Sequence, residues 1–520
     1  MAITLFGAAS TPVDDVAATE AGPSVTITPP ASMTAGDLAV VYVQYRGTHS
    51  TLANFLLPTT YGGQDWQYQV GSYGTNISFR QLWCRFNGTW SVDPIFSVTD
   101  EVGTPTGTAA MTAVMLVFRP TSSSKHWQVR EHNIGTDSTN AITITGYTPG
   151  VDNTVTVAAW GRADDVTFSN LSGTNWTQSG LSVQYRNTTG TDQACSFAYQ
   201  IQSTAAALNN VAQDESIAGL TRTIITTFCE MDLPSAGTAG TLAVVQSAED
   251  SAELGGTTLT ATFGSAVTSG NSVIGYMNWE TANAGWPIIT DNQSNTYYHA
   301  MRVSDDSVTQ DGIVFWCTNI TNAPTAVTVT ISASEIFRAI TVVEINGGIE
   351  LDKVAGVWWL TSDTGSADTV STYAVTPSSS GQFCFGGTFN SDAHPADADY
   401  WHAVAPWSNE NEIALGGVGN EVANHATFYF IQAVAASLTF QIDNDLGRRA
   451  IPVMATFKAA SSVATPALIQ PWNAQRLPAP RSLAALQRYW QATPADPIPV
   501  DPTMKGGPGR NFFLVKLRRY

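Results

Sequence analysis

The chain has 520 residues, which is too long for one ordinary domain. Charged residues make up only 12% of it and apolar residues 43%, so it has neither the charge density of a disordered chain nor the charged faces of a helical one. Its net charge of −19 argues against a nucleic-acid-binding protein, which would carry a basic patch. The aromatic and threonine-rich composition instead indicates β structure.

The N-terminal MAITLFGAAS has no basic residue before its short apolar stretch, unlike a secretory signal. No apolar run approaches the length of about eighteen residues that a membrane helix needs, so no membrane partner is expected. The five cysteines cannot all pair and form no C-x-x-C motif, which predicts buried, reduced thiols rather than a disulfide framework or a zinc site. This usage fits assembly in a cytoplasm. The cysteines are Cys84, Cys195, Cys229, Cys317 and Cys384.

The sequence contains an internal repeat. Residues 22–37, GPSVTITPPASMTAGD, align without a gap with residues 256–271, GTTLTATFGSAVTSGN, and the apolar runs LAVVYVQY and SVIGYMNW follow. A Trp-Cys pair at 83–84 recurs at 316–317, and the closing run TAVMLVF matches AITVVEI. These matches in one register indicate that the first and third quarters of the chain are homologous modules.

The second and fourth quarters match more weakly. YTPGVDNTVTVAAWG (147–161) resembles VTPSSSGQFCFGGTF (375–389), and the Thr-Phe pair at 227–228 corresponds to the pair at 456–457. The sequence therefore predicts four modules arranged as a duplicated pair, followed by a tail. Their predicted boundaries are 1–121, 122–233, 234–352, 353–460 and 461–520.

Within each module the apolar residues alternate, as in SVTITPP, or run continuously with β-branched residues, as in RAITVVEI. Turn sequences such as YGG at 61–63 and NGG at 346–348 interrupt these runs every eight to twelve residues. Short strands at this spacing predict an all-β fold of four tandem antiparallel β-sandwiches. Jelly-roll and immunoglobulin-like strand orders both fit the pattern.

The composition changes sharply after residue 460. Residues 461–520 hold nine of the 25 prolines and eight of the 23 basic residues but only two acids, so this tail carries +6 and the rest of the chain −25. Between proline-rich spacers, RSLAALQRYWQA predicts one short helix and NFFLVKLRRY a basic strand. Neither can bury its apolar face alone, so we expect the tail to extend away from the modules and anchor the protein on another chain. The predicted anchor residues are Leu483, Leu486, Trp490, Arg510, Phe513, Val515, Leu517, Arg518 and Arg519.

Candidate catalytic and metal-binding residues are few. The chain lacks G-x-S-x-G, H-E-x-x-H and Walker motifs. The pairs Asp164-Asp165 and Asp305-Asp306 resemble glycosidase carboxylates, but adjacent acids on a strand point to opposite faces, which favours loops. The segment DAHPADADYWH has donors for a divalent cation, although a solvated loop is the favoured interpretation. Its candidate ligands are Asp392, His394, Asp397, Asp399 and His402. We predict no catalytic residue, no cofactor and no metal site.

Aromatic residues offer a test for glycan binding. Trp358-Trp359, Trp401 and Trp407 could form a sugar-stacking platform if they were exposed together. Such residues more often fill sandwich cores or contacts between modules. Aromatic side chains packed inside the modules would favour a structural protein, and an exposed cluster would favour a binding protein.

The third predicted module contains a recognisable series of motifs. DNQSNTY at 291–297 is followed by NIT at 319–321, VTV at 327–329 and EING at 344–347. This series resembles a β-sandwich repeat of tailed-phage virion proteins and some bacterial surface proteins, in which a D-N-x-G-N-x-Y turn precedes N-V/I-T, T-V-T-V and E-Y-x-G segments. The resemblance implies a structural or receptor-facing role on a phage particle, and it carries over no catalytic residue.

The match to this family is incomplete. Ser294 stands where the family turn has glycine, and Ala323 and Ala326 replace the glycine and the first threonine of the strand-entry segment. The first module keeps the outline of the repeat but lacks the D-N-x-x-N turn.

Two functions fit the sequence. The first is a non-enzymatic structural protein of a tailed-phage particle, a surface-displayed capsid decoration, head fibre or tail component that assembles in the host cytoplasm. Its partners would be capsid or tail subunits and copies of itself. The second is a receptor- or glycan-binding fibre or adhesin whose loops engage a host surface glycan. A polysaccharide-degrading enzyme is the third and least favoured reading.

Overall fold

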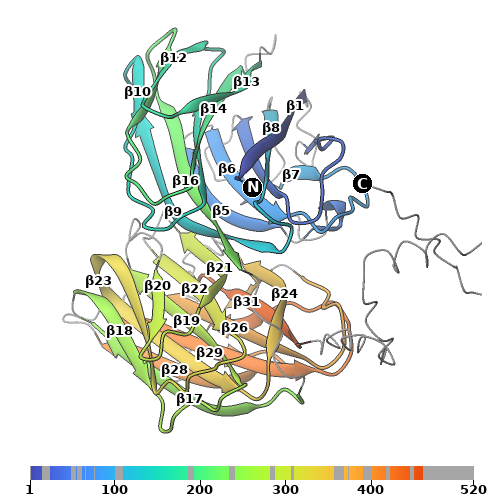
Figure 1. Ribbon diagram of the computed structural model, residues 1–520, viewed down its shortest axis with the longest axis vertical. Helices are drawn as coiled ribbons and strands as arrows, with labels where there is room; N and C mark the ends of the chain where they lie inside the picture. Colours follow the sequence, from blue (N-terminus) through green and yellow to red (C-terminus); the bar gives the residue numbers. More distant parts are fainter. Residues whose placement is uncertain are drawn as a thin grey trace, which may run out of the picture. The chain divides into compact units, whose positions relative to one another are not determined.

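The computed structural model has an all-β fold, which confirms the predicted class (Figure 1). Its described part contains 31 strands and one short 3-10 segment, η1 (Tyr61–Gly63). The residues that the structure describes are 2–13, 24–47, 54–55, 61–64, 66–74, 77–99, 109–185, 192–232, 240–253, 255–280, 287–305, 310–356, 368–372, 374–390, 401–416, 422–444 and 450–460. The predicted tail with its short helix lies outside them.

The strands form four consecutive sets along the chain. Set 1 comprises β1 (Thr4–Val13), β2 (Ser24–Thr26), β3 (Leu38–Gly47), β4 (Asn54–Phe55), β5 (Gln67–Gly74), β6 (Ile77–Arg85), β7 (Ile95–Thr99) and β8 (Ala109–Arg119). Set 2 comprises β9 (Lys125–Asp137), β10 (Ala141–Ile144), β11 (Thr154–Arg162), β12 (Phe168–Ser172), β13 (Thr177–Tyr185), β14 (Gln193–Gln202), β15 (Val211–Glu215) and β16 (Thr221–Asp232).

The second half of the chain repeats this organisation. Set 3 comprises β17 (Val244–Ala252), β18 (Gly256–Thr262), β19 (Ser272–Glu280), β20 (Ile288–Asp291), β21 (Tyr298–Asp305), β22 (Gln310–Cys317) and β23 (Ala326–Ile345). Set 4 comprises β24 (Ile349–Gly356), β25 (Asp368–Ser371), β26 (Gln382–Asn390), β27 (Trp401–Ala403), β28 (Ser408–Gly416), β29 (Val422–Gln432), β30 (Gln441–Asn444) and β31 (Val453–Ala459). The predicted module boundary at residue 352 falls within β24, whose partner β31 belongs to set 4.

All four sets have the same strand order. Counted from the start of a set, the larger sheet runs first, eighth, third, sixth and fifth, and the smaller sheet runs second, seventh and fourth. In set 3 the long strand β23 supplies both the seventh and the eighth positions, because one half pairs with β18 and β20 and the other with β17 and β19. Phe337 has a φ of 43° where β23 passes from one sheet to the other.

The register between strands repeats as well. In set 1, Val40 lies opposite Trp83, and in set 3 Ile274, which aligns with Val40 in the internal repeat, lies opposite Trp316. The matched sequences therefore take matched places in the two sheets.

Sets 2 and 4 show the same correspondence. Val155 lies opposite Phe228 in set 2, and Phe383 lies opposite Phe457 in set 4. The weaker sequence match between the second and fourth quarters thus also appears as one register.

All five cysteines are buried, which confirms their predicted burial, and each is a free thiol. Cys84 lies opposite Ala39 on β3, and Cys317 lies opposite Val273 on β19, so the two thiols hold equivalent positions. Burial raises the pKa of the Cys317 thiol to about 12, because the thiolate would lose its hydration. These cysteines act as small apolar core residues.

The third strand of each set is buried over most of its described length. β3, β11, β19 and β26 show continuous runs of buried residues rather than an alternation of buried and exposed ones, and the half-buried Arg46 and Glu280 lie near strand ends. One face packs against the smaller sheet of the same set: in set 2, for example, Trp160 shares a buried cluster with Ile142 and Phe168. The other face packs against the larger sheet of a neighbouring set, set 1 on set 2 and set 3 on set 4.

Sets 1 and 2 are called the first pair below, and sets 3 and 4 the second pair. In the first pair β1 contacts β13 and β5 contacts β9, and in the second pair β17 contacts β28 and β21 contacts β24. The first strand of each set therefore lies against the fifth strand of its partner, in both directions. This is the reciprocal contact pattern of a two-fold dimer, built here inside one chain.

Candidate functional site

The structure describes only part of the predicted site residues. The nine predicted anchor residues belong to segment 461–520, which lies outside the described residues. Four of the candidate ligands lie in segment 391–400, also outside them. His402, on β27, lies opposite Asp443 of β30, and the side chain of His402 is outside the described part. The anchor and the cation-binding potential of this loop stay predictions.

Asp164 and Asp165 lie with Asp192 in a partly exposed carboxylate cluster on set 2. β11 ends at Arg162 and its neighbour β14 begins at Gln193, so the residues just outside these two strand ends meet. One oxygen from each acid lies within 4.8 Å of the others, and such oxygens suit a hard cation. Arg162 Nη2, 3.9 Å from Asp164 Oδ2, supplies a competing positive charge. The sequence analysis missed Asp192 because the contact depends on strand pairing.

The second predicted acidic pair, Asp305-Asp306, lies largely outside the described residues. Asp305 lies opposite Gln310 at the end of β21, and its side chain and Asp306 lie outside the described residues.

Described aromatic side chains pack inward. Trp407 is only 4% exposed, and its ring centroid lies 4.8 Å from those of both Phe430 and Phe440. Among the described residues, the large hydrophobic side chains that are exposed are all aliphatic. Trp358, Trp359 and the side chain of Trp401 lie outside the described part. The described surface therefore offers no aromatic platform for a sugar.

Set 4 carries a groove of about 410 Å³ beside the Ala405–Pro406 peptide bond. Its walls come from the end of β29 and the start of β30, with Ile431 44% exposed on one side. None of its lining residues is charged, so the groove contains no acid–base pair for hydrolytic chemistry.

The contact between sets 1 and 2 encloses a small neutral hydrogen-bond network. Gln81 Nε2 donates to the Tyr42 hydroxyl at 2.5 Å, and Thr226 of β16 donates to Gln81 Oε1 at 2.7 Å. The Tyr42 ring also packs against Phe197 of β14, with centroids 5.1 Å apart. Partners for the buried amide thus come from both sets, which fixes how the two sheets lie against each other.

The contact between sets 3 and 4 encloses an imidazole. His425 of β29 is fully buried, and its ring stacks on that of Tyr276 with centroids 5.1 Å apart. Its Nε2 atom accepts a hydrogen bond of 2.8 Å from the Thr341 hydroxyl. Its Nδ1 donates to Asn278 Oδ1. Both contacts are satisfied by the neutral tautomer with hydrogen on Nδ1. Burial lowers the pKa of His425 to about 3, since the site provides no counter-charge for an imidazolium.

A buried ion pair lies where set 3 meets set 2. Arg302 of β21 donates to Asp311 Oδ1 of β22 through Nε at 3.0 Å and Nη2 at 2.9 Å. The ring of Trp279 lies 5.3 Å from the guanidinium. Arg302 Nη1 lies 3.4 Å from Nδ1 of His132, which belongs to β9 of set 2. One guanidinium therefore connects the two pairs.

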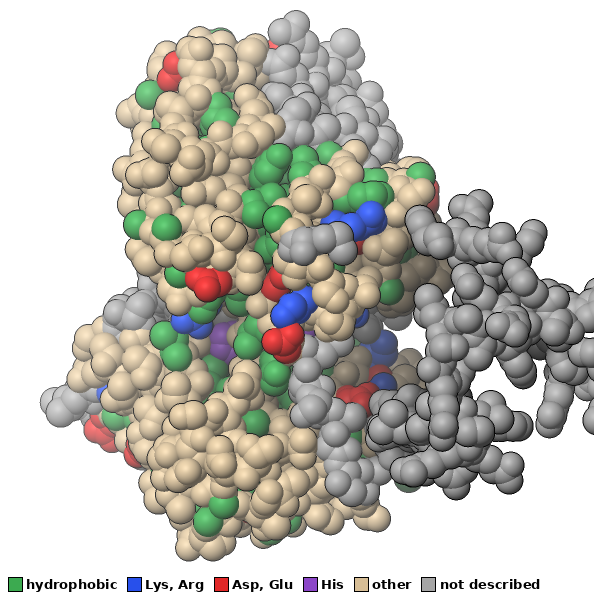
Figure 2. Space-filling view, viewed as in Figure 1, with side chains coloured by type: hydrophobic (Ala, Val, Ile, Leu, Met, Phe, Trp, Pro, Cys, Tyr) green, Lys and Arg blue, Asp and Glu red, His purple; other side chains and the backbone are tan. Residues whose placement is uncertain are grey.

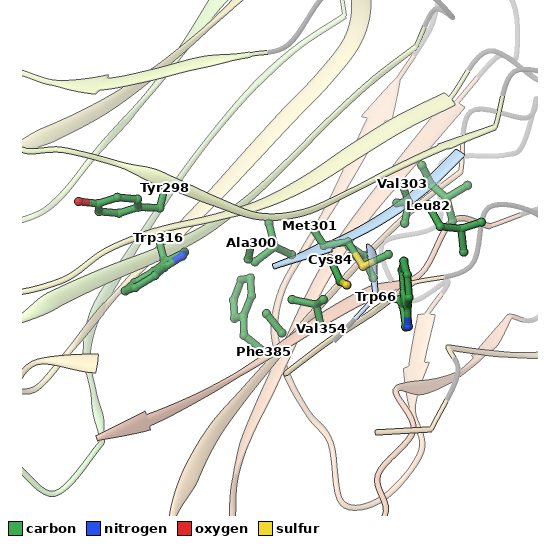
Figure 3. Close-up of a cluster of buried hydrophobic side chains, with 14 of the residues drawn as sticks. Trp66, Leu82, Cys84, Tyr298, Ala300, Met301, Val303, Trp316, Val354 and Phe385 are labelled. Atoms are coloured by element: carbon green, nitrogen blue, oxygen red, sulfur yellow. The ribbon is translucent and has the colours of Figure 1, made fainter. Parts of the chain in front are cut away.

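A hydrophobic cluster also links the first pair to the second pair (Figure 3). Its labelled members come from set 1 (Trp66, Leu82, Cys84), set 3 (Tyr298, Ala300, Met301, Val303, Trp316) and set 4 (Val354, Phe385). Fully burying a large apolar side chain contributes about 1.5–3 kcal/mol before entropic costs. This burial accounts for the compactness of segment Met1–Ser462, which forms one unit.

The D-N-x-x-N-x-Y motif of the third set forms a turn. Asp291 Oδ1 accepts from the backbone N–H groups of Gln293 and Asn295, and its Oδ2 accepts from Asn295 Nδ2 and the Tyr297 hydroxyl. Ser294 has a φ of 62°, the left-handed conformation that glycine adopts without strain. The family glycine at this place thus has a conformational reason, and the motif's polar groups are engaged in the turn itself.

No known protein family matches the sequence, and no curated protein matches it significantly. Within the described part of the chain, no helix has the length and hydrophobicity to cross a bilayer.

Proposed function

We propose that each strand set is a β-sandwich module of jelly-roll type, and that the chain consists of four such modules in a duplicated pair. An eight-stranded jelly roll has one sheet with the strand order first-eighth-third-sixth and a second sheet that contains the order second-seventh-fourth. Each set here has both orders. Here the fifth strand joins the larger sheet. An immunoglobulin-like sandwich would place the first strand beside the second, a pairing that is absent among the described strands.

We infer that the protein is a non-enzymatic structural component of a tailed-phage particle, surface-displayed as a capsid decoration, head fibre or tail component. The observation that carries this proposal is the recurrence of the doubly buried sheet in both pairs. Apolar strands, buried aromatics and buried polar groups are all used to hold modules together. A protein organised in this way serves as a rigid spacer and display surface.

Other observations support a structural role over an enzymatic one. The described aromatics face inward, the groove on set 4 has no charged lining residue, and the acidic cluster on set 2 has an arginine beside it. Acid–base catalysis needs two positioned groups within reach of one substrate atom, and the described residues contain no such arrangement in a pocket.

The charge distribution supports anchoring through the tail. The tail carries +6 and the remainder −25, but screening limits attraction between exposed charges beyond about 8–10 Å at physiological salt. Stable anchoring therefore also needs the tail's apolar residues to be covered by a capsid subunit, a tail subunit or another copy of this chain.

The test is incorporation of tail variants into phage particles. We expect the full chain in purified particles, and we expect deletion of residues 481–520 to abolish incorporation while the circular dichroism of the purified protein keeps its β signal. A matched variant replaces Phe513, Val515 and Leu517 with serine, which keeps tail length and charge. A control replaces the exposed Val434 with serine. Mass spectrometry of the particles measures the copies per particle.

The outcomes separate the alternatives. Normal incorporation of the deletion variant would show that the tail is not the anchor, and absence of the full chain from particles would overturn the virion assignment. Binding of the purified protein to host surface glycan, without particle association, would support the adhesin. Release of oligosaccharides would reveal an enzyme.

A further inference from the structure

Histidine side chains lie where strand sets meet. The structure describes four of them: His126 and His132 on β9, His299 on β21 and His425 on β29. His425 lies between sets 3 and 4, His126 near Arg85 of set 1, and the other two at the junction of sets 2 and 3. Figure 2 shows histidine atoms beside basic and acidic side chains in the band between the first and second pairs.

The contact between His132 and Arg302 requires a neutral imidazole. A guanidinium has only donors, so the Nδ1 atom of His132, 3.4 Å from Arg302 Nη1, must present its lone pair. Arg302 is clamped by Asp311, and their side chains are 2% and 0% exposed, so the guanidinium cannot move into solvent without breaking the ion pair. A proton on Nδ1 would replace this contact with two facing cations.

His299 lies at the same junction because β21 contains a bulge. The register against β22 shifts between His299 and Met301, which places Ala300 and Met301 together in the apolar cluster. His299 and Arg302 consequently point away from that cluster. His299 is 8% exposed, and its ring interacts with the backbone of Val129 in set 2.

We propose that the junction between the two pairs is an acid-sensitive contact, in which proton uptake by His132 and His299 separates set 3 from set 2 while each pair stays folded. The contact that opens is between two regions of the same chain, set 3 and set 2. The network around Gln81 between sets 1 and 2 is neutral, and His126, the described histidine near set 1, lies beside Arg85 rather than Arg302.

The charges around these rings favour opening in acid. The charged residues on the strands that carry these groups are Lys125, Arg130, Glu131 and Asp137 of β9, Arg302 and Asp305 of β21, Asp311 of β22 and Glu280 of β19. Those whose charge acts on the imidazoles are arginines, Arg302 on both rings and Arg130 on His299. Asp311 is engaged by Arg302. Protonation would therefore add positive charge to a site where arginines already set the potential.

The pH range follows from linkage. Burial and then Arg130 lower the pKa of His299 to about 3, and burial and then Arg302 hold that of partly buried His132 well below 6.5. Rings released into water would titrate near 6.5. Below that pH the histidines bind protons in the open state but not in the closed state. The equilibrium constant for opening therefore rises by up to about tenfold per histidine per pH unit. For His299 alone this is about 50-fold between pH 6.5 and 4.5.

Small-angle X-ray scattering of the full chain tests the proposal. The radius of gyration should increase reversibly between pH 7.5 and 4.5, while far-UV circular dichroism keeps the β signal. The double variant His132→Gln, His299→Gln should shift the opening midpoint down by at least about one pH unit. The control His126→Gln changes another β9 histidine, beside Arg85 rather than Arg302, and should behave like wild type.

An unchanged radius of gyration at pH 4.5, loss of the β signal together with expansion, or opening of the double variant at the wild-type pH would each overturn the proposal. If the double variant lacks the native spectrum at pH 7.5, the two single variants replace it, and a lower midpoint in both is still required.

Discussion

The two interfaces inside the pairs are built alike but hide different chemistry. Each joins two five-stranded sheets of the same order, and each has a tyrosine near its centre at aligned positions, Tyr42 in set 1 and Tyr276 in set 3. The Tyr42 hydroxyl accepts a hydrogen bond from Gln81. The Tyr276 hydroxyl has no hydrogen-bond partner in the described part of the chain, and its ring instead stacks on His425.

This difference distinguishes the apolar faces, which bring the sheets together, from the polar groups that lie between them. The shared apolar faces are sufficient to bring two such sheets together, because both interfaces have them. The polar groups in between then vary, and one left unpaired, such as the Tyr276 hydroxyl, costs about 1–3 kcal/mol. At the centre of its interface the second pair thus has an imidazole, His425, where the centre of the first interface has an amide and hydroxyls.

The largest effect is expected from a glycine in the second pair. A Cβ atom at Gly387 would overlap the Tyr276 ring, whereas one at Gly161, in the first pair, would meet Gln44 Oε1 at 2.7 Å and the Phe79 ring at 2.9 Å. Gly387→Ala should lower the local unfolding free energy by about 3 kcal/mol, and Gly161→Ala by about 1–2 kcal/mol. The ring contact would be closer at Gly387 than the 2.9 Å at Gly161, and the end of the Gln44 side chain can move. Native-state hydrogen exchange of β26 and β11 measures both.

Gly264→Ala is the control, since a Cβ there meets nothing within 4 Å. Equal losses at Gly387 and Gly161 would mean that the two interfaces are packed equally tightly.

The next effect is the pH dependence that His425 gives to the second pair. The folded-state pKa of His425 is about 3, below its unfolded value near 6.5, so the unfolded state binds the proton first as the pH falls. Between pH 6.5 and 4.5 the unfolding free energy of β26 and β29 should fall by about 2–3 kcal/mol from this group. Hydrogen exchange, corrected for intrinsic rates, measures this loss in β26 and β29.

The variant His425→Gln should remove this pH dependence. If β26 and β29 of this variant lose as much stability between pH 6.5 and 4.5 as in the wild type, the assignment to His425 is wrong.

The smallest effect compares the two tyrosines directly. Tyr42→Phe should cost about 1–2 kcal/mol, because it removes the hydroxyl that accepts from the buried Gln81 amide. Tyr276→Phe should change stability by less than about 0.5 kcal/mol or increase it, because its hydroxyl forms no hydrogen bond there. Exchange rates of β3 and β19 measure the two variants. A larger loss in Tyr276→Phe would reveal an unrecognised partner of that hydroxyl.

Much of the fold could be predicted from local patterns. The repeat aligned Trp83 with Trp316, and the structure gives these residues the same register position. The left-handed conformation of Ser294 was not predicted, because serine stands where the resembling repeats have glycine. Strand periodicity and the positions of turns depend on residues that are close together in the chain, so a single sequence is enough to predict them.

The candidate site was much less predictable. Asp192 joins Asp164 only through the pairing of β14 with β11, and Arg302 reaches His132 from another strand set. The clue to Arg302 was a charged residue within the otherwise apolar run YYHAMRV, but that pattern gives no hint of its partner.

The sequence alone determined that this chain is built of short β-strands in two related halves, because side-chain periodicity and repeated turns are local properties. Only the tertiary structure decided which faces meet. A strand such as LAVVYVQY, apolar on both sides, can bury its second face against any other apolar sheet. The choice of set 2 as the partner of set 1, and the placement of His132 against Arg302, depend on shape and on hydrogen bonds between residues more than a hundred positions apart in the chain.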